Sequence, residues 1–299
     1  MKKQIILITG ATAGLGRGLA IALAQRGHHV IATGRRQDAL DSLQIEAAGG
    51  KVDTFRLDVT NAESIANAQK EVERLTGGYG VDVLVNNAGF GILAPFELTT
   101  DQEMRSMFET NVFGLAAMTR AFLPQMRERG AGRVINVSSV GGRLTLPFFG
   151  AYNATKYAVE SMSDAMRVEL QSFGVKVVLI EPGATNTEFN DVAFNSEALV
   201  DGSPDAAHSP YADIISKMSG IRSLVEKTAA KPESVVRGMV HAVEARNPGA
   251  RYVLPAYNSI GIFFKTILPT RLWDAILGFA TGLRSLGAKK TRSAPALTT

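Results

Sequence analysis

Short runs of β-branched and apolar residues recur along the first two thirds of the chain, separated by longer stretches with helical patterning. Runs of about four to eight such residues are typical of strands buried on both faces of a sheet. Their alternation with helices predicts right-handed crossovers onto one parallel sheet with helices on both faces. The sequence therefore predicts an α/β fold with a doubly wound parallel sheet, its strands at residues 4–9, 29–33, 52–57, 81–85, 133–137 and 175–180.

Size and composition fit one large domain. The chain has 299 residues, of which 45% are hydrophobic, so it can bury a full core, and no linker divides it. We expect a single domain over residues 1–258, followed by a helical extension and tail over residues 259–299. The chain has no cysteine, which excludes disulfides and thiol catalysis, and its four histidines show no metal-ligand spacing, so no metal site is predicted.

The charge of the chain argues against a nucleic-acid partner. Its net charge is +4, and no run of lysines and arginines of the nucleic-acid-binding kind occurs. Residues 1–3 lead directly into the first predicted strand, without the separate hydrophobic segment and cleavage site of a secretory signal. We therefore expect a cytoplasmic protein.

A glycine-rich turn follows the first predicted strand and precedes a predicted helix. Strand, turn and helix in this order place free backbone N–H groups and a helix N-terminus against a pyrophosphate. The spacing departs from the common G-x-G-x-x-G pattern, so a tight turn alone is the alternative interpretation of these glycines. The candidate phosphate-binding residues of this turn are Gly10, Thr12, Gly14, Leu15 and Gly16.

Tyr152 and Lys156 lie four residues apart in a predicted helix and therefore share one helical face. The ammonium can favour the ionised phenol, which would give an acid/base pair near neutral pH. Ser139, thirteen residues before Tyr152, can hold a carbonyl oxygen beside the phenol. Asn111 lies in a predicted helical stretch from about residue 101 to 129, where asparagine is a poor helix former. A helix kink or an incidental surface asparagine is the alternative there.

Together these motifs resemble those of the short-chain dehydrogenases/reductases, over residues 4 to about 190. The motifs that occur in that family's order are Thr9-Gly10-x-x-x-Gly14-x-Gly16, Asn86-Asn87-Ala88-Gly89, Asn111, Ser139, Tyr152-x-x-x-Lys156 and Pro182-Gly183. The resemblance implies a Rossmann-type fold, a nicotinamide dinucleotide cofactor and interconversion of a carbonyl compound and an alcohol. Family members often form homodimers or homotetramers, and we expect one of these here.

The resemblance also implies roles for single residues. Its catalytic set is Asn111, Ser139, Tyr152 and Lys156, with Asn111 binding a water that links Lys156 to solvent. Tyr152 and Lys156 also contact the cofactor, Lys156 through the nicotinamide ribose. The further cofactor contacts are Asp58, Val59, Asn86, Ala88, Gly89, Pro182, Gly183 and Thr187. Asp58 could instead cap the next helix, and the motif at Asn86 could be an ordinary turn.

The residues after the second predicted strand favour NADP(H) over NAD. An NAD enzyme usually presents an acidic residue there to the ribose hydroxyls, whereas this chain has Gly34-Arg35-Arg36. A guanidinium can bind a 2′-phosphate through two hydrogen bonds. Arg35 is the first candidate and Arg36 the second. The alternative is that both arginines begin a solvated helix.

The small-molecule substrate depends on two less regular regions. A polar, irregular segment at about residues 184–231 is typical of a substrate loop. Charges at Lys265, Arg271 and Asp274 interrupt the apolar C-terminal extension, so no transmembrane segment is predicted. The extension could cover the cleft, a second subunit or a membrane surface.

The extension also resembles the steroid- and retinoid-type members of the family, such as the 17-beta-hydroxysteroid dehydrogenases. That resemblance implies a lipophilic ketone, aldehyde or alcohol, of a steroid, retinoid or fatty-chain kind. Reduction of a 3-oxoacyl carrier protein is the second interpretation, and a non-catalytic NADP-sensing protein the third. The sequence leaves the identity of the substrate, the physiological direction and the oligomeric state open.

Overall fold

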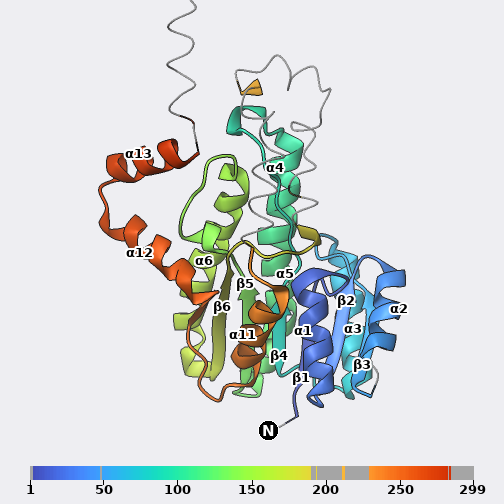
Figure 1. Cartoon of the computed structure of the whole chain (residues 1–299). Helices are drawn as coiled ribbons and strands as arrows, with labels where there is room; N and C mark the ends of the chain where they lie inside the picture. Colours follow the sequence, from blue (N-terminus) through green and yellow to red (C-terminus); the bar gives the residue numbers. More distant parts are fainter. Residues whose placement is uncertain are drawn as a thin grey trace, which may run out of the picture.

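A computed structural model of the chain describes residues 3–47, 49–189, 193, 211–212, 229–281 and 283. Seven parallel strands form one sheet in the order β3-β2-β1-β4-β5-β6-β7 (Figure 1). Their bounds are β1 Ile5–Ile8, β2 His29–Gly34, β3 Lys51–Arg56, β4 Val83–Asn86, β5 Gly132–Val137, β6 Val175–Pro182 and β7 Arg251–Leu254. The prediction of a doubly wound parallel sheet is confirmed, and β7 adds a seventh strand to the six predicted.

Helices cover both faces of this sheet (Figure 1). The helices that pack on the sheet, or precede those that do, are α1 Gly14–Gln25, α2 Gln37–Glu46, α3 Ala62–Thr76, α4 Asp101–Phe108, α5 Leu115–Glu128, α6 Gly150–Glu169 and α11 Pro232–Glu244. Alternation along β1 separates two cores, since Ile6 and Ile8 pack with α1 and α11, whereas Leu7 packs with α3 and α5. Val159 of α6 packs against Leu179 of β6.

The order of the strands places a crevice beyond their carboxyl ends. From β1 the chain adds β2 and β3 on one side, and it then adds β4 and the later strands on the other side of β1. The direction of the strand order therefore reverses between β1 and β4. Ligands of open α/β sheets bind at such a reversal, outside the carboxyl ends of the strands. The segments that follow β1, β2, β4, β5 and β6 all begin at this edge, and they contain most of the predicted site residues.

The predicted helical stretch at residues 101–129 consists of three parts. Helix α4 is capped by Thr100, whose hydroxyl accepts from the Glu103 N–H while the Glu103 carboxylate accepts from the Thr100 N–H. A π-helical segment, Glu109–Gly114, then separates α4 from α5, and it contains Asn111. Single π-turns inside α-helices are frequent at functional sites.

Two helices follow β7 and leave the layered body of the molecule. They are α12 Ser259–Ile267 and α13 Thr270–Ala280, and Figure 1 shows them extending beyond the sheet beside α6. Among the described residues, no helix combines the length and the apolar character that crossing a membrane requires. The predicted substrate loop at residues 184–231 lies mainly outside the described residues, as do residues 282 and 284–299 of the predicted extension and tail.

Candidate active site

The glycine turn after β1 allows a close approach that side chains would block. Gly10 has φ +66°, and a Cβ built on it would lie 2.7 Å from the Cα of Ala88. A Cβ on Gly16 would lie 2.4 Å from the carbonyl oxygen of Gly10. Helix α1 begins at Gly14 with Ala13 at its N-cap and no acidic residue in its first turn. Its first N–H groups therefore have no side-chain acceptor from the cap, which suits an anion.

Asn87 holds this turn in place; it belongs to the motif after β4 but is not among the predicted cofactor contacts. Its Nδ2 donates to the carbonyl oxygens of Gly10 at 2.9 Å and Thr9 at 3.1 Å. The hydroxyl of Thr9 accepts from the backbone N–H groups of Asn87 and Ala88, each at 3.0 Å. The segment after β4 thus clamps the segment after β1. The available signal was the position of Asn87 directly after a buried strand.

Asn86 is oriented differently from its neighbour. Its Nδ2 donates to Thr119 Oγ1 of α5 and to Asn136 Oδ1 of β5, both at 2.9 Å, and Asn136 Nδ2 donates to Ser163 Oγ of α6 at 2.8 Å. These buried groups form a polar chain across β4, α5, β5 and α6. The side chain of Asn86 is therefore part of the core, and a cofactor contact from this residue stays a prediction for its backbone.

Several other predicted contacts border the glycine turn. A Cβ on Gly14 would lie 3.5 Å from Thr187 Cβ, so Thr187, after β6, faces the turn. A Cβ on Gly34 would lie 2.5 Å from Thr12 Cγ2, so the absence of a side chain at Gly34 leaves room for Thr12. Leu15 is half-buried against the core. These residues come from the ends of β1, β2 and β6 and meet at one edge of the sheet.

Tyr152 lies buried near the start of α6, between aromatic rings. Its ring centroid is 6.3 Å from that of Phe149 and 5.5 Å from that of Phe189. Burial raises the pKa of its phenol to about 12, although a hydrogen bond with Ser139 lowers it. The net shift of this pKa is therefore upward, against the predicted lowering, because the apolar surroundings of the phenol dominate. Gly91 packs directly on the ring, since a Cβ there would lie 2.9 Å from Tyr152 Cδ2.

Ser139 lies in the turn between β5 and α6. Its Oγ accepts from the Gly141 N–H at 3.0 Å and donates to the Pro182 carbonyl oxygen at 3.3 Å. Ser138 faces away from this point: a Cβ on Gly142 would lie 2.7 Å from its Oγ and 3.0 Å from Glu160 Cγ. The structure therefore places Ser139, and not Ser138, beside the phenol of Tyr152.

Lys156 lies one turn after Tyr152 and is buried as well. Its Nζ donates to the Val137 carbonyl oxygen at 2.9 Å and lies 5.8 Å from the centroid of the Tyr152 ring. Burial lowers the pKa of this amine to about 8, although the charge of Glu160 raises it. Gly89 allows the segment after β4 to approach Asn111, since a Cβ on it would lie 2.9 Å from Asn111 Oδ1, and the same position is 3.6 Å from Lys156 Nζ.

Both polar atoms of the Asn111 side-chain amide form hydrogen bonds. Its Oδ1 accepts from the Phe90 N–H at 3.0 Å, and its Nδ2 donates to the Phe90 carbonyl oxygen at 2.8 Å and to Thr155 Oγ1 at 3.0 Å. These bonds join the π-helical segment, the segment after β4 and α6, which explains an asparagine in the middle of a helical stretch. A water link from Asn111 to Lys156 stays a prediction.

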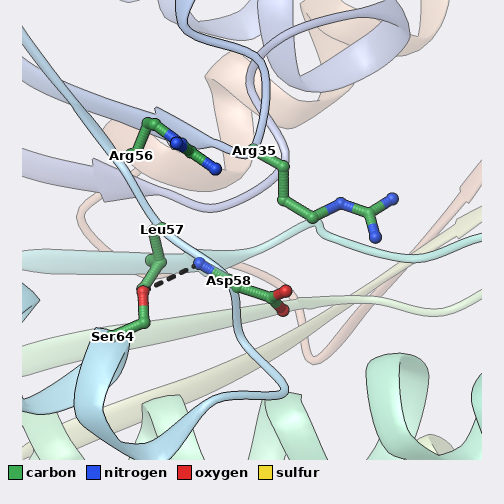
Figure 2. Close-up of a pocket in the computed structure, with 5 residues that line it drawn as sticks. All are labelled: Arg35, Arg56, Leu57, Asp58 and Ser64. Carbon is green, nitrogen blue, oxygen red and sulfur yellow. Dashed lines mark hydrogen bonds between the residues drawn. The ribbon is translucent and has the colours of Figure 1, made fainter.

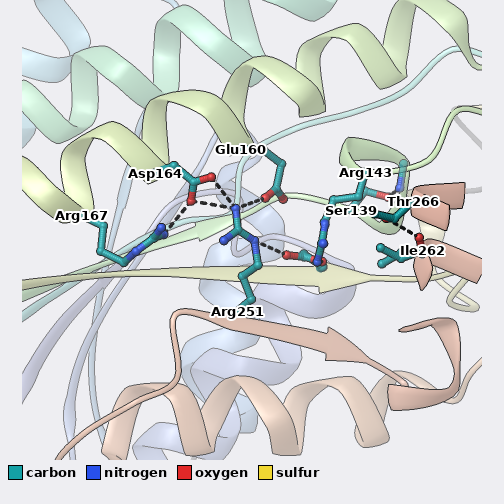
Figure 3. A network of polar contacts seen from close by, with 10 residues as sticks. Ser139, Arg143, Glu160, Asp164, Arg167, Arg251, Ile262 and Thr266 are labelled. Carbon is teal, nitrogen blue, oxygen red and sulfur yellow. Dashed lines mark hydrogen bonds and ion pairs between the residues drawn. The ribbon is translucent and has the colours of Figure 1, made fainter. Parts of the chain in front are cut away.

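One turn after Lys156 in α6, Glu160 shares Arg251 with the buried carboxyl group of Glu181 (Figure 3). Arg251 of β7 lies 3.1 Å from Glu160 and 3.0 Å from Glu181, and it also pairs with Asp164 at 2.7 Å. Arg143 reaches Glu181 at 3.4 Å. Burial raises the pKa of both Glu160 and Glu181, and the arginines oppose this effect. Sequence reasoning missed this network because its members come from α6, β6, β7 and a turn.

A second region of the crevice lies beyond the ends of β2 and β3. An open pocket of about 260 Å³ is lined by Arg35, Arg56, Leu57, Asp58 and Ser64 (Figure 2). Arg56 was not predicted; strand register brings it here, since it pairs with Gly34 across β2 and β3. The two guanidinium groups make this pocket suitable for an anion. Arg36 lies apart from it, donates to the Thr12 carbonyl oxygen at 3.4 Å and pairs with Glu188 at 3.2 Å.

Asp58 does not cap α3, which corrects the alternative prediction. The N-cap is Asn61, whose side chain accepts from the Ser64 N–H. Asp58 Oδ1 instead accepts from the N–H and the hydroxyl of Thr60, at 2.9 and 2.7 Å. Partial burial raises the pKa of Asp58, but these bonds and the charge of Arg35 outweigh it, so the pKa is lowered overall. The carboxylate therefore carries a charge in this pocket.

The remaining predicted residues serve mainly as walls. Val59 is buried, and a Cβ on Gly114 would lie 2.8 Å from its Cγ2. Gly183 follows Pro182 at the end of β6, and a Cβ on it would lie 2.3 Å from Asn258 Nδ2. In the part of the chain that the structure describes, no group of three or more histidines, aspartates or glutamates is arranged to hold a metal ion.

Comparison with known proteins gives consistent matches. A model of the family described as short chain dehydrogenase matches residues 4–198. A 3-ketodihydrosphingosine reductase from Bacteroides thetaiotaomicron is 38% identical over 252 residues, which cover 84% of this chain and 87% of that protein. The human 17-beta-hydroxysteroid dehydrogenase type 1 is 36% identical over 262 residues, which cover 84% of this chain and 77% of that protein.

Solved structures agree with these matches. A short-chain dehydrogenase from Streptomyces avermitilis has a TM-score of 0.74 and 35% identity, covering 96% of this chain and 99% of that one. A serine dehydrogenase complexed with NADP+ has a TM-score of 0.71 and 31% identity, covering 83% and 93%. A similar enzyme from Burkholderia phymatum, in complex with NAD, has a TM-score of 0.75 and 25% identity, covering 88% and 92%.

Proposed function

The chain belongs to the short-chain dehydrogenase/reductase family, and from this premise we propose that it is an NADP(H)-dependent oxidoreductase that interconverts a lipophilic ketone or aldehyde and its alcohol. One observation carries the proposal: the phenol of Tyr152 lies between Phe149 and Phe189, with Ser139 at its oxygen and Lys156 one turn behind. An apolar wall around a single proton donor suits a hydrophobic carbonyl compound.

The crevice has the features that a nicotinamide dinucleotide needs. Because Gly10 and Gly16 have no side chains, the backbone beside the uncapped N-terminus of α1 is accessible, and a pyrophosphate would bind there. Thr187 and the backbone after β4 would flank it. When bound, the dinucleotide supplies or accepts the hydride of the reaction.

Proton transfer in this proposal belongs to Tyr152. Because burial raises the pKa of its phenol to about 12, the hydroxyl stays protonated at neutral pH and can donate its proton to a carbonyl oxygen. Ser139 Oγ holds the same oxygen in position. The charged amine of Lys156 stabilises the phenolate that remains after donation. Oxidation of an alcohol uses the same groups in the opposite order.

The preference for NADP(H) in this proposal rests on the pocket between β2 and β3. Arg35 and Arg56 bring two guanidinium groups to it, and a 2′-phosphate is the part of the cofactor that such groups bind. The lipophilic substrate is supported by the aromatic walls around Tyr152. The similarity of the chain to a 3-ketodihydrosphingosine reductase and to a 17-beta-hydroxysteroid dehydrogenase also supports a lipophilic substrate.

The test is NADPH oxidation with a panel of steroid ketones, retinals, long-chain ketones, acyl thioesters and small ketones. We expect turnover with the lipophilic carbonyl compounds. Tyr152→Phe should lower kcat at least about 100-fold, the usual contribution of a positioned acid, with little change in NADPH affinity. Tyr157→Phe, on the exposed side of the same helix, is the matched control and should keep full activity. Normal turnover by Tyr152→Phe would refute the assignment.

A further inference from the structure

The two C-terminal helices turn their apolar side chains to solvent. In α12 the exposed residues Ile260, Phe263, Phe264 and Ile267 follow the i, i+3, i+4, i+7 spacing of one helical face. In α13 the exposed residues Leu272, Ile276 and Phe279 follow the i, i+4, i+7 spacing, and Phe279 is 82% exposed. We name these seven side chains the C-terminal apolar face.

This face is not turned toward the domain. In α12 the one buried residue is Ile262, and a Cβ on the adjacent Gly261 would lie 3.5 Å from Leu144, so this side of the helix rests on the turn before α6. The structure describes every residue of α13, and none of them is buried. Soluble monomers rarely expose many large apolar side chains close together in the chain, so the seven exposed side chains of α12 and α13 point to a partner.

The charge of the extension indicates which partner. Residues 259–299 contain six lysines and arginines, Lys265, Arg271, Arg284, Lys289, Lys290 and Arg292, and one acidic residue, Asp274. Their net charge is therefore +5, whereas the whole chain carries +4 and the other 258 residues together carry −1. The basic excess of the sequence thus lies in residues 259–299: Lys265 and Arg271 belong to the helices that carry the apolar face, and the other four basic residues follow them in the sequence, outside the described residues.

We propose that the C-terminal apolar face binds the surface of an anionic lipid bilayer, with α12 and α13 lying in the interfacial plane. Apolar side chains on one face and basic residues in the same segment are the combination by which amphipathic helices bind such membranes. A second copy of this chain suits the face less well, because pairing the same surfaces would bring two segments of charge +5 together.

The position of α12 shows on which side of the proposed active site a bound bilayer would lie. Figure 3 shows Ile262 and Thr266 of α12 near Ser139 and Arg143, in the turn that precedes Tyr152. A bilayer against the C-terminal apolar face would therefore lie on the side of the molecule that carries this turn. The binding itself does not depend on the proposed reaction, and it can be measured without substrate.

The experiment is co-sedimentation of the full chain with vesicles of phosphatidylcholine, with and without phosphatidylglycerol. We expect binding to the anionic vesicles and its loss as salt is raised. The variant Phe263→Ser/Ile267→Ser/Phe279→Ser should lower the partition coefficient more than about tenfold, because three apolar side chains leave the lipid. Ile45→Ser/Val168→Ser removes residues that are 77% and 70% exposed elsewhere and should bind as the parent chain does.

A charge variant provides a second test that leaves the apolar residues intact. Lys265→Gln/Arg271→Gln should lower the partition coefficient about fivefold per charge removed, whereas Lys51→Gln/Lys70→Gln should leave it unchanged. Absence of vesicle binding, or equal binding to vesicles without anionic lipid, would overturn the proposal. So would a fall in oligomeric mass on analytical ultracentrifugation of the apolar variant without a change in vesicle binding, since that result assigns the face to a second copy.

Discussion

At the residue scale, the amine of Lys156 is subject to two opposing influences. Burial lowers its pKa to about 8, and the charge of Glu160, one turn later in α6, raises it. Glu160 is itself paired with Arg251 of β7. The proton affinity of the amine therefore depends on residues that do not contact the phenol. An amine with a pKa near 8 stays mostly charged at pH 7 and loses its charge in mildly alkaline solution.

We predict that Glu160→Gln moves the alkaline limb of the kcat/KM profile to lower pH. Removal of the negative charge lowers the pKa of Lys156 further below about 8, so the amine loses its proton earlier as the pH rises. The profile should be measured for carbonyl reduction by NADPH. Asp164→Asn, which removes another partner of Arg251, should leave the limb in place. An unchanged limb in Glu160→Gln contradicts this role.

Arg35 and Arg56 allow a second prediction at this scale. Replacing either by serine should weaken NADPH binding about 10- to 100-fold, which corresponds to one lost hydrogen bond to a charged group. NADH binding should change little. Arg74→Ser, on the exposed side of α3 and outside the pocket, is the control. Isothermal titration gives the constants, and equal losses for both dinucleotides would exclude a 2′-phosphate role. Gly34 is not substituted in this experiment, because a Cβ on it would lie 2.5 Å from Thr12 Cγ2.

At the scale of elements, the turn between β1 and α1 depends on the segment after β4. Asn87 donates to the carbonyl oxygens of Thr9 and Gly10, whereas the adjacent Asn86 donates into the core toward α5 and β5. Two neighbouring asparagines at one strand end therefore serve different structures. One shapes the crevice, and the other joins the layers.

This difference can be tested with a matched pair. Asn87→Ala should weaken NADPH and NADH binding by a similar factor, about tenfold, because the phosphate turn loses a hydrogen-bonded clamp that both cofactors need. Asn86→Ala should instead lower the free energy of unfolding by about 1–3 kcal/mol, with the dinucleotide affinity of the folded protein preserved. Calorimetric titration and urea unfolding distinguish the two. Identical behaviour of both variants would show that the asparagines are not divided in this way.

The elements themselves were largely predictable. Buried strands of a parallel sheet read as short β-branched runs, so six strands and their order along the chain could be read directly. Strand β7 was not predicted because it has only four residues and its apolar run is limited to Tyr252-Val253-Leu254. The π-helical segment escaped because its conformation follows from the bonds of Asn111 with Phe90 and Thr155, which are tertiary contacts.

The candidate site divides in the same way. Gly10, Ser139, Tyr152 and Lys156 could be found because their chemistry depends on spacing along one or two elements. Asn87 and Arg56 could not be singled out, since each acts through contacts or strand register with segments distant in sequence. The shift of the Tyr152 pKa was predicted in the wrong direction because the burial of the phenol is a tertiary property.

At the scale of the whole molecule, burying the charged amine of Lys156 near the crevice lowers the free energy of unfolding, although the proposed reaction needs that amine. Lys156 has a pKa of about 8 in the folded chain, below the ordinary lysine value of 10.5 that applies in the unfolded chain. Below pH 8 the amine is charged in both the folded and the unfolded chain, so the full cost of burying the charge is present. As pH rises from about 8 to 10.5 the folded chain releases the proton first, and this cost fades.

We predict that Lys156→Met unfolds at higher urea concentration than the parent chain at pH 7, with a gain of about 3 kcal/mol, the free energy of this pKa shift. The gain should shrink toward pH 10 for the reason just given, while activity is lost at every pH. Lys70→Met, on the exposed face of α3, should show no gain that depends on pH in this way. A gain that is constant between pH 7 and pH 10 would show that burial of the charge is not the cause.

The clamp on the glycine turn also affects when the protein can first bind its dinucleotide. Asn87 lies 77 residues after Gly10, so a nascent chain leaving the ribosome with β1 and α1 already made still lacks the partner that shapes its phosphate loop. The dinucleotide therefore cannot act as a template for early folding. The dinucleotide stabilises only the completed sheet, by about 2.7 kcal/mol when its concentration is a hundred times its dissociation constant.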